Sequence, residues 1–324
     1  MANKAVAVPE DSARSTAGSA VALNAARRRT QMDWGYALFL APGLLAFLIL
    51  IVLPVLANFA ISFTRWTGVG APTWIGLNNY AKALGDAIFW TSFRNNLYLI
   101  VAMVIIPTII GLILAATLYD YVAKRFGNGA TTLFRSGFYL PQILPVVVAA
   151  LVWTWIYNPN SGAINTLLVD LGLPELQQNW LGNSSLALPS VMVMLVWFQI
   201  GYPLVLFIAG MQRIDPEIYE AAAMDSATWL QRFYRITIPL LRPEIYVVVL
   251  TTTINALKTF GPIYAMTRGG PGSSTIVASY FSYKNFFENA NVGYGATMAT
   301  VLTLIVMVIA VVYIRVQTRQ EANA

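Results

Sequence analysis

Six apolar runs, each about as long as a helix that crosses a lipid bilayer, are spread along the chain. A hydrocarbon core of about 30 Å requires roughly 20 residues in helical conformation. The composition agrees with such a structure, because 57% of the residues are hydrophobic and only 10% are charged, against roughly a quarter charged in soluble domains. The runs therefore predict an all-α, polytopic membrane protein with six transmembrane helices, at residues 36–63, 97–119, 134–157, 186–211, 245–266 and 297–314.

Lysine and arginine are unevenly distributed between the segments that connect these runs. They are frequent in the N-terminal tail, after the second and fourth runs and at the C-terminus, whereas the loop after the third run has none. Because cytoplasmic loops carry an excess of these residues, both termini are predicted to be cytoplasmic, in a multi-pass protein of the cell (plasma or inner) membrane. The net charge of +6 then reflects topology and contact with the lipid bilayer, and no nucleic-acid partner is expected.

The chain ends are expected to differ from the part between them. Residues 1–33 are rich in Ala, Ser and charge and lack apolar periodicity, which predicts a disordered cytoplasmic N-terminal tail. Residues 34–316 form the predicted six-span transmembrane domain, and residues 317–324 a short cytoplasmic C-terminal tail.

Several kinds of chemistry have no residues to support them. The sequence contains no His and no Cys, which excludes disulfides, thiol chemistry and the usual zinc or haem ligands. It also has no phosphate-binding loop, since the one Lys that precedes a Ser or Thr is Lys258, which follows Leu257. We therefore expect no metal site, no bound cofactor and no enzymatic activity in this chain, and ATP hydrolysis, if it drives the protein, on a separate polypeptide.

A charged, amphipathic loop at residues 215–243 lies between the fourth and fifth runs. Asp215 is placed to cap a helix and Pro216 suits its first turn. A face of small residues follows, of the kind that allows another protein to approach closely, and a second helix is expected after it. The residues that we expect to contact a partner are Glu220, Ala221, Ala222, Ala223, Asp225 and Ser226.

This loop resembles the EAA loop of ABC-importer permeases, in which EAA is followed by three residues, Gly, about nine residues and I-x-L-P. The chain has Glu-Ala-Ala from position 220 and Ile-Thr-Ile-Pro-Leu-Leu over residues 236–241. It departs from the pattern at Ser226, where Gly is usual, and at Ile238, where Leu is usual. Glycine tolerates positive φ at a helix end, so the turn at Ser226 is predicted either to differ slightly in conformation or to be mildly strained. The resemblance implies that the loop couples the chain to an ATPase.

A second resemblance concerns the loops on the other side of the membrane. The stretch Thr-Arg-Gly-Gly-Pro-Gly-Ser-Ser-Thr at 267–275, with Tyr283, Phe286, Phe287 and the Gly-Tyr-Gly at 293–295, is similar to MalF-type sugar permeases. The phrase Ile-Gly-Leu-Asn-Asn-Tyr at 75–80 also matches, and the resemblance covers roughly residues 36–316. An ordinary external turn is the alternative interpretation of the Gly-Gly-Pro sequence taken alone.

These resemblances imply a type I ABC importer permease fold and a function. The chain is expected to translocate a carbohydrate by alternating access, next to a MalG-type permease and above an ABC ATPase dimer that uses ATP and Mg. An extracytoplasmic solute-binding protein would deliver the substrate. The alternatives are a stand-alone secondary transporter or channel for a small polar solute, which should show intramembrane carboxylates or a proton relay, and a receptor or scaffold, which would not need the coupling loop.

Residues of the substrate pathway are predicted in the fourth and fifth runs. The resemblance implies Gly201 and Leu204 in the fourth, and the fifth places polar and small residues at a helical spacing of three to four, on one face. Cross-helix bonding is the alternative role for such Thr and Asn side chains. Lys258 is expected to face water, a polar partner or the bundle interior, because a buried Lys costs at least about 2.5 kcal/mol, and it either bonds a neighbouring helix or contacts a polar or anionic solute. The residues predicted in the fifth run are Thr252, Asn255, Ala256, Lys258 and Thr259.

Overall fold

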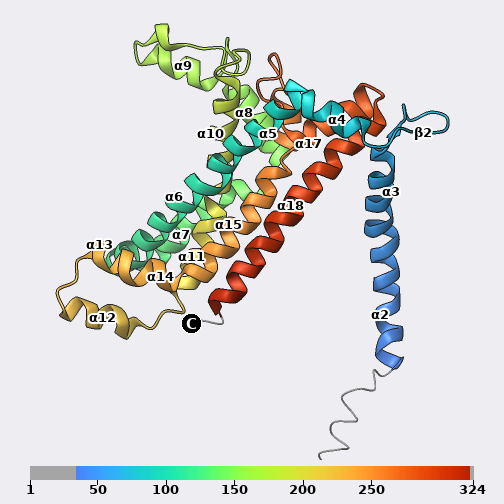
Figure 1. Ribbon diagram of the computed structural model, residues 1–324. Coiled ribbons are helices and arrows are strands. Elements are labelled where there is room, and N and C mark those ends of the chain that lie inside the picture. Colours follow the sequence, from blue (N-terminus) through green and yellow to red (C-terminus); the bar gives the residue numbers. More distant parts are fainter. Residues whose placement is uncertain (1–33, 322–324) are drawn as a thin grey trace, which may run out of the picture. The chain divides into compact units, whose positions relative to one another are not determined.

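A computed structural model describes residues 34–321 of the protein (Figure 1). The predicted N-terminal tail, residues 1–33, lies outside the described residues. The chain divides into two compact units, 1–57 and 58–324, which are described here one at a time.

The first unit contains the helix predicted from the first apolar run. It begins with α2 (Trp34–Phe47), continues through a π-helical turn (Leu48–Val52) and enters α3 (Leu53–Ser62), whose last residues belong to the second unit. The helical stretch Leu38–Ser62 is long and apolar enough to cross a membrane.

The second unit is a bundle of helices with a short antiparallel strand pair at one end. Its elements are β1 (Thr64–Arg65), β2 (Thr73–Trp74), α4 (Asn78–Gly85), α5 (Ala87–Ile100), α6 (Ile106–Thr117), α7 (Ala123–Ile143), α8 (Val146–Ile156), α9 (Ala163–Asp170), α10 (Ala187–Gln199), α11 (Gly201–Met211), α12 (Pro216–Met224), α13 (Trp229–Arg232), α14 (Ile238–Leu240), α15 (Arg242–Leu257), α16 (Gly261–Met266), α17 (Ala278–Tyr283) and α18 (Val292–Glu321). Further π-helical turns occupy Val101–Ile105, Leu118–Val122, Phe233–Thr237 and Lys284–Glu288, and a 3₁₀ turn lies at Pro174–Leu176.

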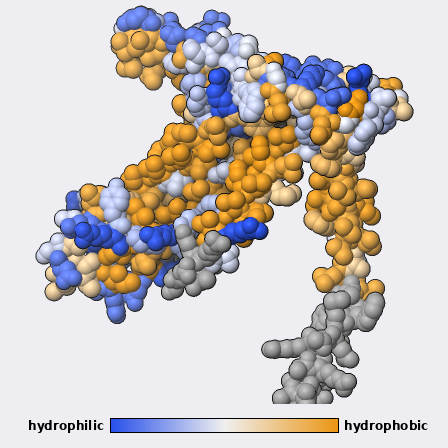
Figure 2. Space-filling view, in the orientation of Figure 1, coloured by the Kyte–Doolittle hydropathy of each residue, from blue (hydrophilic) through white to orange (hydrophobic). Residues whose placement is uncertain are grey.

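The described residues agree with the predicted all-α class and with six spans. Four helices are long and apolar enough to cross a membrane, and two bent pairs bring the number to six when each pair counts as one span. Apolar side chains form a broad band across the middle of the second unit, and polar side chains gather at its two ends (Figure 2).

Two of the predicted spans are not straight helices. In the third, α7 and α8 meet at an angle of 95°, at Leu144 and Pro145. A proline lacks a backbone N–H and forces the residue before it out of the helical region, and Leu144 is indeed extended, with ψ of 142°. The fifth span stops at Leu257, and helix resumes only at Gly261, so residues 258–260 are an irregular break.

Other spans extend beyond the predicted limits. The second is part of a helical stretch of 41 residues, Ala87–Gly127, because polar residues near its start are bonded inside the bundle and do not end the helix. The last helix continues to Glu321, past the predicted boundary at residue 316.

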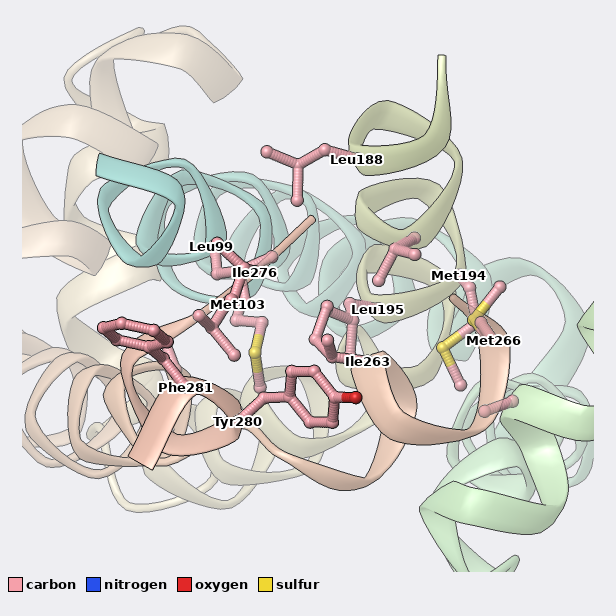
Figure 3. Packing of buried hydrophobic residues seen from close by; sticks show 14 of the residues in the cluster. Leu99, Met103, Leu188, Met194, Leu195, Ile263, Met266, Ile276, Tyr280 and Phe281 are labelled. Carbon is pink, nitrogen blue, oxygen red and sulfur yellow. The ribbon is translucent and has the colours of Figure 1, made fainter. Parts of the chain in front are cut away.

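The core of the second unit consists of two main clusters of buried apolar residues. One lies toward the end that carries α4 and α17, where Met103, Leu195, Ile263 and Tyr280 converge from four segments (Figure 3). The other lies toward the end that carries α12, and its buried residues include Leu112, Phe207 and Leu241. The coupling loop therefore begins and ends on a packed scaffold.

Candidate coupling loop and translocation pathway

The first helix of the loop forms as its sequence predicts. Asp215 caps α12, since its carboxylate accepts a hydrogen bond from the backbone N–H of Glu217 at 3.0 Å, and Pro216 occupies the first turn. The helix is therefore closed at its start by local chemistry alone, whatever contacts it makes elsewhere.

The turn after α12 confirms the strain that the missing glycine predicts. The N–H of Ala227 bonds the carbonyl of Ala222 at 3.0 Å, and the N–H of Ser226 bonds that of Ala223 at 3.0 Å. This pair of bonds is the Schellman pattern, whose central residue adopts the left-handed conformation. Ser226 has φ of 58°, a conformation that costs a residue with a side chain roughly 1–2 kcal/mol.

Two contacts stabilise the loop from within, and a third joins the two segments that flank it. The Tyr219 hydroxyl lies 3.0 Å from that of Thr237 in a buried contact, and burial raises the pKa of Tyr219 above its ordinary value. Thr228 and Gln231 form a capping box at the start of α13. Arg213, just after α11, pairs with Glu244 in the first turn of α15, which ties the two ends of the loop together.

The predicted partner-binding residues are mostly exposed. Glu220, Ala221, Ala223, Asp225 and Ser226 are exposed, while Ala222 is half-buried against the second half of the loop. Sequence reasoning missed two apolar side chains on the same helix: the side chain of Met224 is 86% exposed and that of Ile218 is 42% exposed. A large apolar residue within a polar loop was the signal that could have revealed them. Their role, like that of the predicted residues, stays a prediction.

A cavity of about 480 Å³ separates α12 from the start of α7. Its lining includes two acidic residues, Asp120 and Glu220, and two basic residues, Lys124 and Arg232. The Nε of Arg232 is buried without a hydrogen-bond partner. One face of α12 therefore borders open space, next to the position where Tyr219 packs into the core.

The structure places two of the predicted pathway residues inside helix packing. A Cβ at Gly201 would lie 2.5 Å from the carbonyl oxygen of Phe138, so this glycine allows α11 to approach α7 closely. Leu204 is fully buried in the core and lies beside Gly111, where an added Cβ would come within 3.0 Å of the Leu204 backbone nitrogen. Neither residue lines an open surface in this conformation, and a contact with substrate stays a prediction for both.

The fifth span divides the remaining predicted residues into two groups. Thr252, Ala256 and Thr259 are buried, and the hydroxyls of the two threonines donate to carbonyls of their own segment, those of Val248 and Asn255. Asn255 and Lys258 are exposed, so the predicted face is not shared by all of these residues. Lys258 directly follows the last residue of α15. Its positive charge is stabilised there by the negative end of the helix dipole.

A buried asparagine supports the break in this span. Asn96 donates to the carbonyls of Ala256 and Leu257, each at 3.2 Å, and accepts from the N–H of Ala278 at 2.9 Å. Irregular backbone at membrane depth is tolerated only where its polar groups find partners. Sequence reasoning missed Asn96, although two adjacent Asn residues at the start of an apolar helix were a usable signal.

Asn95, which precedes Asn96 in the chain, likewise forms hydrogen bonds with backbone carbonyls, here in and just after the Gly-Gly-Pro loop. Its side-chain amide donates to the carbonyls of Ser274 and Ile276 at 2.9 and 2.8 Å. Thr275 closes the loop from within, since its hydroxyl donates to the carbonyl of Gly270 at 2.9 Å. The loop is therefore more than an ordinary external turn.

The other motif residues at this end of the bundle also serve as internal supports. Asn79 donates to the carbonyls of Ser62 and Thr64 at 2.9 and 2.8 Å. A Cβ at Gly293 would lie 1.9 Å from the Thr64 carbonyl oxygen, so only glycine fits. Tyr294 donates its hydroxyl to Asp86 at 2.7 Å.

Comparison with known proteins agrees with this architecture. Residues 130–323 match the family described as "Binding-protein-dependent transport system inner membrane component". The chain is 35% identical to "Probable ABC transporter permease protein YurN" of Bacillus subtilis, over 86% of this chain and 94% of that protein. It is 32% identical to "Trehalose/maltose transport system permease protein MalF" of Thermococcus litoralis, over 87% and 92% of the two chains.

The fold is also that of a solved importer. A chain from the crystal structure of a bacterial ABC transporter involved in the import of the acidic polysaccharide alginate aligns with a TM-score of 0.78 and 21% identity, over 90% of this chain and 98% of that one. The combination of a bent-helix membrane bundle with an EAA-type loop defines an ABC-importer permease. This chain belongs to the family of binding-protein-dependent transport system inner membrane components, and a stand-alone secondary transporter or channel is not favoured.

Proposed function

We propose that this permease carries a carbohydrate across the membrane by alternating access, driven by ATP hydrolysis on separate subunits. The observation that carries the proposal is the coupling loop, which offers an exposed helix to a partner. The Arg213–Glu244 ion pair ties the two ends of this loop together. The names of relatives, such as the trehalose/maltose permease of Thermococcus litoralis, support a carbohydrate as the substrate class.

The arrangement of the second unit supports the proposed partners. The coupling loop and the C-terminal end of α18 lie at one end of the bundle, and α4, α9 and α17 lie at the other (Figure 1). We place the first end in the cytoplasm, where an ATPase dimer would use ATP and Mg, and the second outside, where a solute-binding protein would dock. A second, MalG-type permease would complete the pathway.

Asn255 and Lys258 are the proposed pathway residues of this chain. Both are exposed beside an irregular break, and within the described residues Lys258 forms no ion pair. Its ammonium group is thus available to the hydroxyl or acidic groups of a solute.

Transport tests this assignment. We expect ATP-dependent uptake of a carbohydrate by proteoliposomes that contain the permease, its partner subunits and the binding protein. Lys258→Met should leave assembly intact and impair an acidic or phosphorylated sugar more than a neutral one. Uptake that persists without the ATPase would contradict the proposed class, and equal uptake of both sugars would remove Lys258 from the pathway.

The orientation is tested with single cysteines, for which this cysteine-free chain is suited. Ser226→Cys in the coupling loop should react with an impermeant maleimide only from the cytoplasmic side. Glu175→Cys, in the exposed loop after α9, should react only from outside. The opposite pattern would reverse the proposed topology.

A further inference from the structure

Aromatic side chains form a continuous ladder from the break in the fifth span to the external end. Phe260, two residues after Lys258, stacks on Tyr264 with ring centroids 5.4 Å apart. Tyr264 meets Tyr283 at 5.6 Å, and Tyr283 meets Phe287 at 5.1 Å. The ladder therefore connects the proposed pathway residues with α17 and the turn after it.

The outer part of this ladder consists of the rings of Tyr264, Tyr283 and Phe287, which we call the corner. These rings lie next to a buried aromatic residue. The rings of Tyr264 and Tyr283 are inclined at 82° to each other. Both are half-buried, while the side chain of Phe287 is 69% exposed. Tyr280 beneath them is almost fully buried and belongs to the packed core (Figure 3). Rings held in this way lose little further conformational freedom when a ligand packs against their accessible parts.

Two charges of opposite sign flank the corner. The guanidinium of Arg268 lies 5.5 Å from the centre of the Tyr264 ring. Burial raises the pKa of Tyr280 above its ordinary value, and the Glu288 carboxylate raises it further, so the hydroxyl keeps its proton at neutral pH. Arg268 and Glu288 are both exposed and, within the described residues, form no ion pair with each other. Donors and acceptors thus surround an aromatic surface.

We infer that this corner, formed by Tyr264, Tyr283 and Phe287 between Arg268 and Glu288, is an external subsite for a pyranose ring that enters the pathway. A pyranose has an apolar C–H face, which stacks on an aromatic ring, and an edge of hydroxyls that need both donors and acceptors. Small-molecule sites generally combine aromatic walls with a few such polar groups. The inference rests on the proposed function, because it assigns the corner to the same carbohydrate.

Binding is tested on the importer assembled with its partner subunits in lipid nanodiscs. Saturation-transfer NMR would use maltose, trehalose and xylose at millimolar concentration. We expect transfer to the ring C–H protons of at least one sugar, and its loss in Phe287→Ala and Tyr283→Ala. Tyr283→Phe should keep the signal, because it keeps the ring. Tyr98→Ala on α5, where the side chain is 48% exposed, is the matched control and should also keep it.

Uptake kinetics test the subsite proposal separately from the proposed transport function. If a sugar is transported, loss of one ring should raise KM about three- to tenfold with little change in kcat, the size expected for an aromatic contact. Unchanged transfer and KM in both alanine variants, or no transfer in the wild type, would overturn the subsite while leaving transport intact. Loss of the second permease from Phe287→Ala complexes would instead identify the corner as a subunit interface. Transfer without any ATP-dependent uptake would count against the proposed function alone.

Discussion

The coupling loop and the opposite end of the bundle, which carries α4 and α17, use their motif residues in opposite ways. In the coupling loop, Glu220, Ala221 and Met224 are exposed. At the other end, Asn79 is buried and its amide bonds the carbonyls of Ser62 and Thr64, and only glycine fits at position 293 beside the Thr64 carbonyl. One family pattern thus describes an exposed surface, which we propose contacts a partner, and the other describes internal supports for the backbone.

The largest effect is expected from Asn96→Leu. The change leaves the Leu257 carbonyl and the Ala278 N–H without their partner, while the Ala256 carbonyl keeps its bond from the Thr259 N–H. Each unsatisfied group costs about 1–3 kcal/mol. We expect a loss of at least about 2 kcal/mol of stability, measured as a fall in the thermal unfolding midpoint or in the yield of folded protein. Asn255→Leu, at an exposed site of the span that Asn96 supports, is the control. Equal losses in the two variants would refute the supporting role.

Gly293→Ala should produce the next largest effect. The added Cβ would meet the Thr64 carbonyl at 1.9 Å, and relief of such crowding typically costs about 1–3 kcal/mol. Gly85→Ala at the end of α4 is the matched control, since nothing lies within 4 Å of its added Cβ. Thermal unfolding should distinguish them, and a stable Gly293→Ala protein would contradict the close approach.

A change in the coupling loop should affect function and leave stability almost unaltered. Met224→Asp alters a side chain that is 86% exposed, so unfolding should change by no more than about 0.5 kcal/mol. We expect roughly tenfold weaker binding of the ATPase subunits, the effect of about 1.4 kcal/mol, and a corresponding fall in stimulated ATP hydrolysis. Met224→Leu should retain both. Normal coupling by the Asp variant would show that this side chain does not enter the interface.

The smallest effect is expected from Ser226→Gly. Glycine removes the cost of positive φ, roughly 1–2 kcal/mol, but gives back about 0.4–1 kcal/mol through greater freedom in the unfolded chain. We therefore expect a gain of about 0.5 kcal/mol with unchanged coupling. Ser226→Ala keeps the constraint and should show no gain. A less stable glycine variant would mean that the hydroxyl, rather than the backbone, decides the energy at this turn.

The sequence predicted the number of spans, the caps of α12 and the strained turn, because each depends on residues that are close together in the chain. It did not predict the breaks at Leu144 and at residues 258–260, since apolar content does not report the direction of a helix. The partner that stabilises the second break, Asn96, is 160 residues from Ala256. The exposure of Asn255 likewise depends on which neighbours cover the fifth span.

Because of the irregular break, α15 is a separate helix that runs from the coupling loop at one end to Lys258 at the other. The Arg213–Glu244 pair ties the first turn of this helix to the segment that enters the coupling loop, and the helix ends beside Lys258 after 16 residues. At 1.5 Å per residue the helix is about 24 Å long. If the ATPases displace the loop as we propose, α15 would deliver that displacement at membrane depth, next to Lys258, and the break would let α16 stay in place.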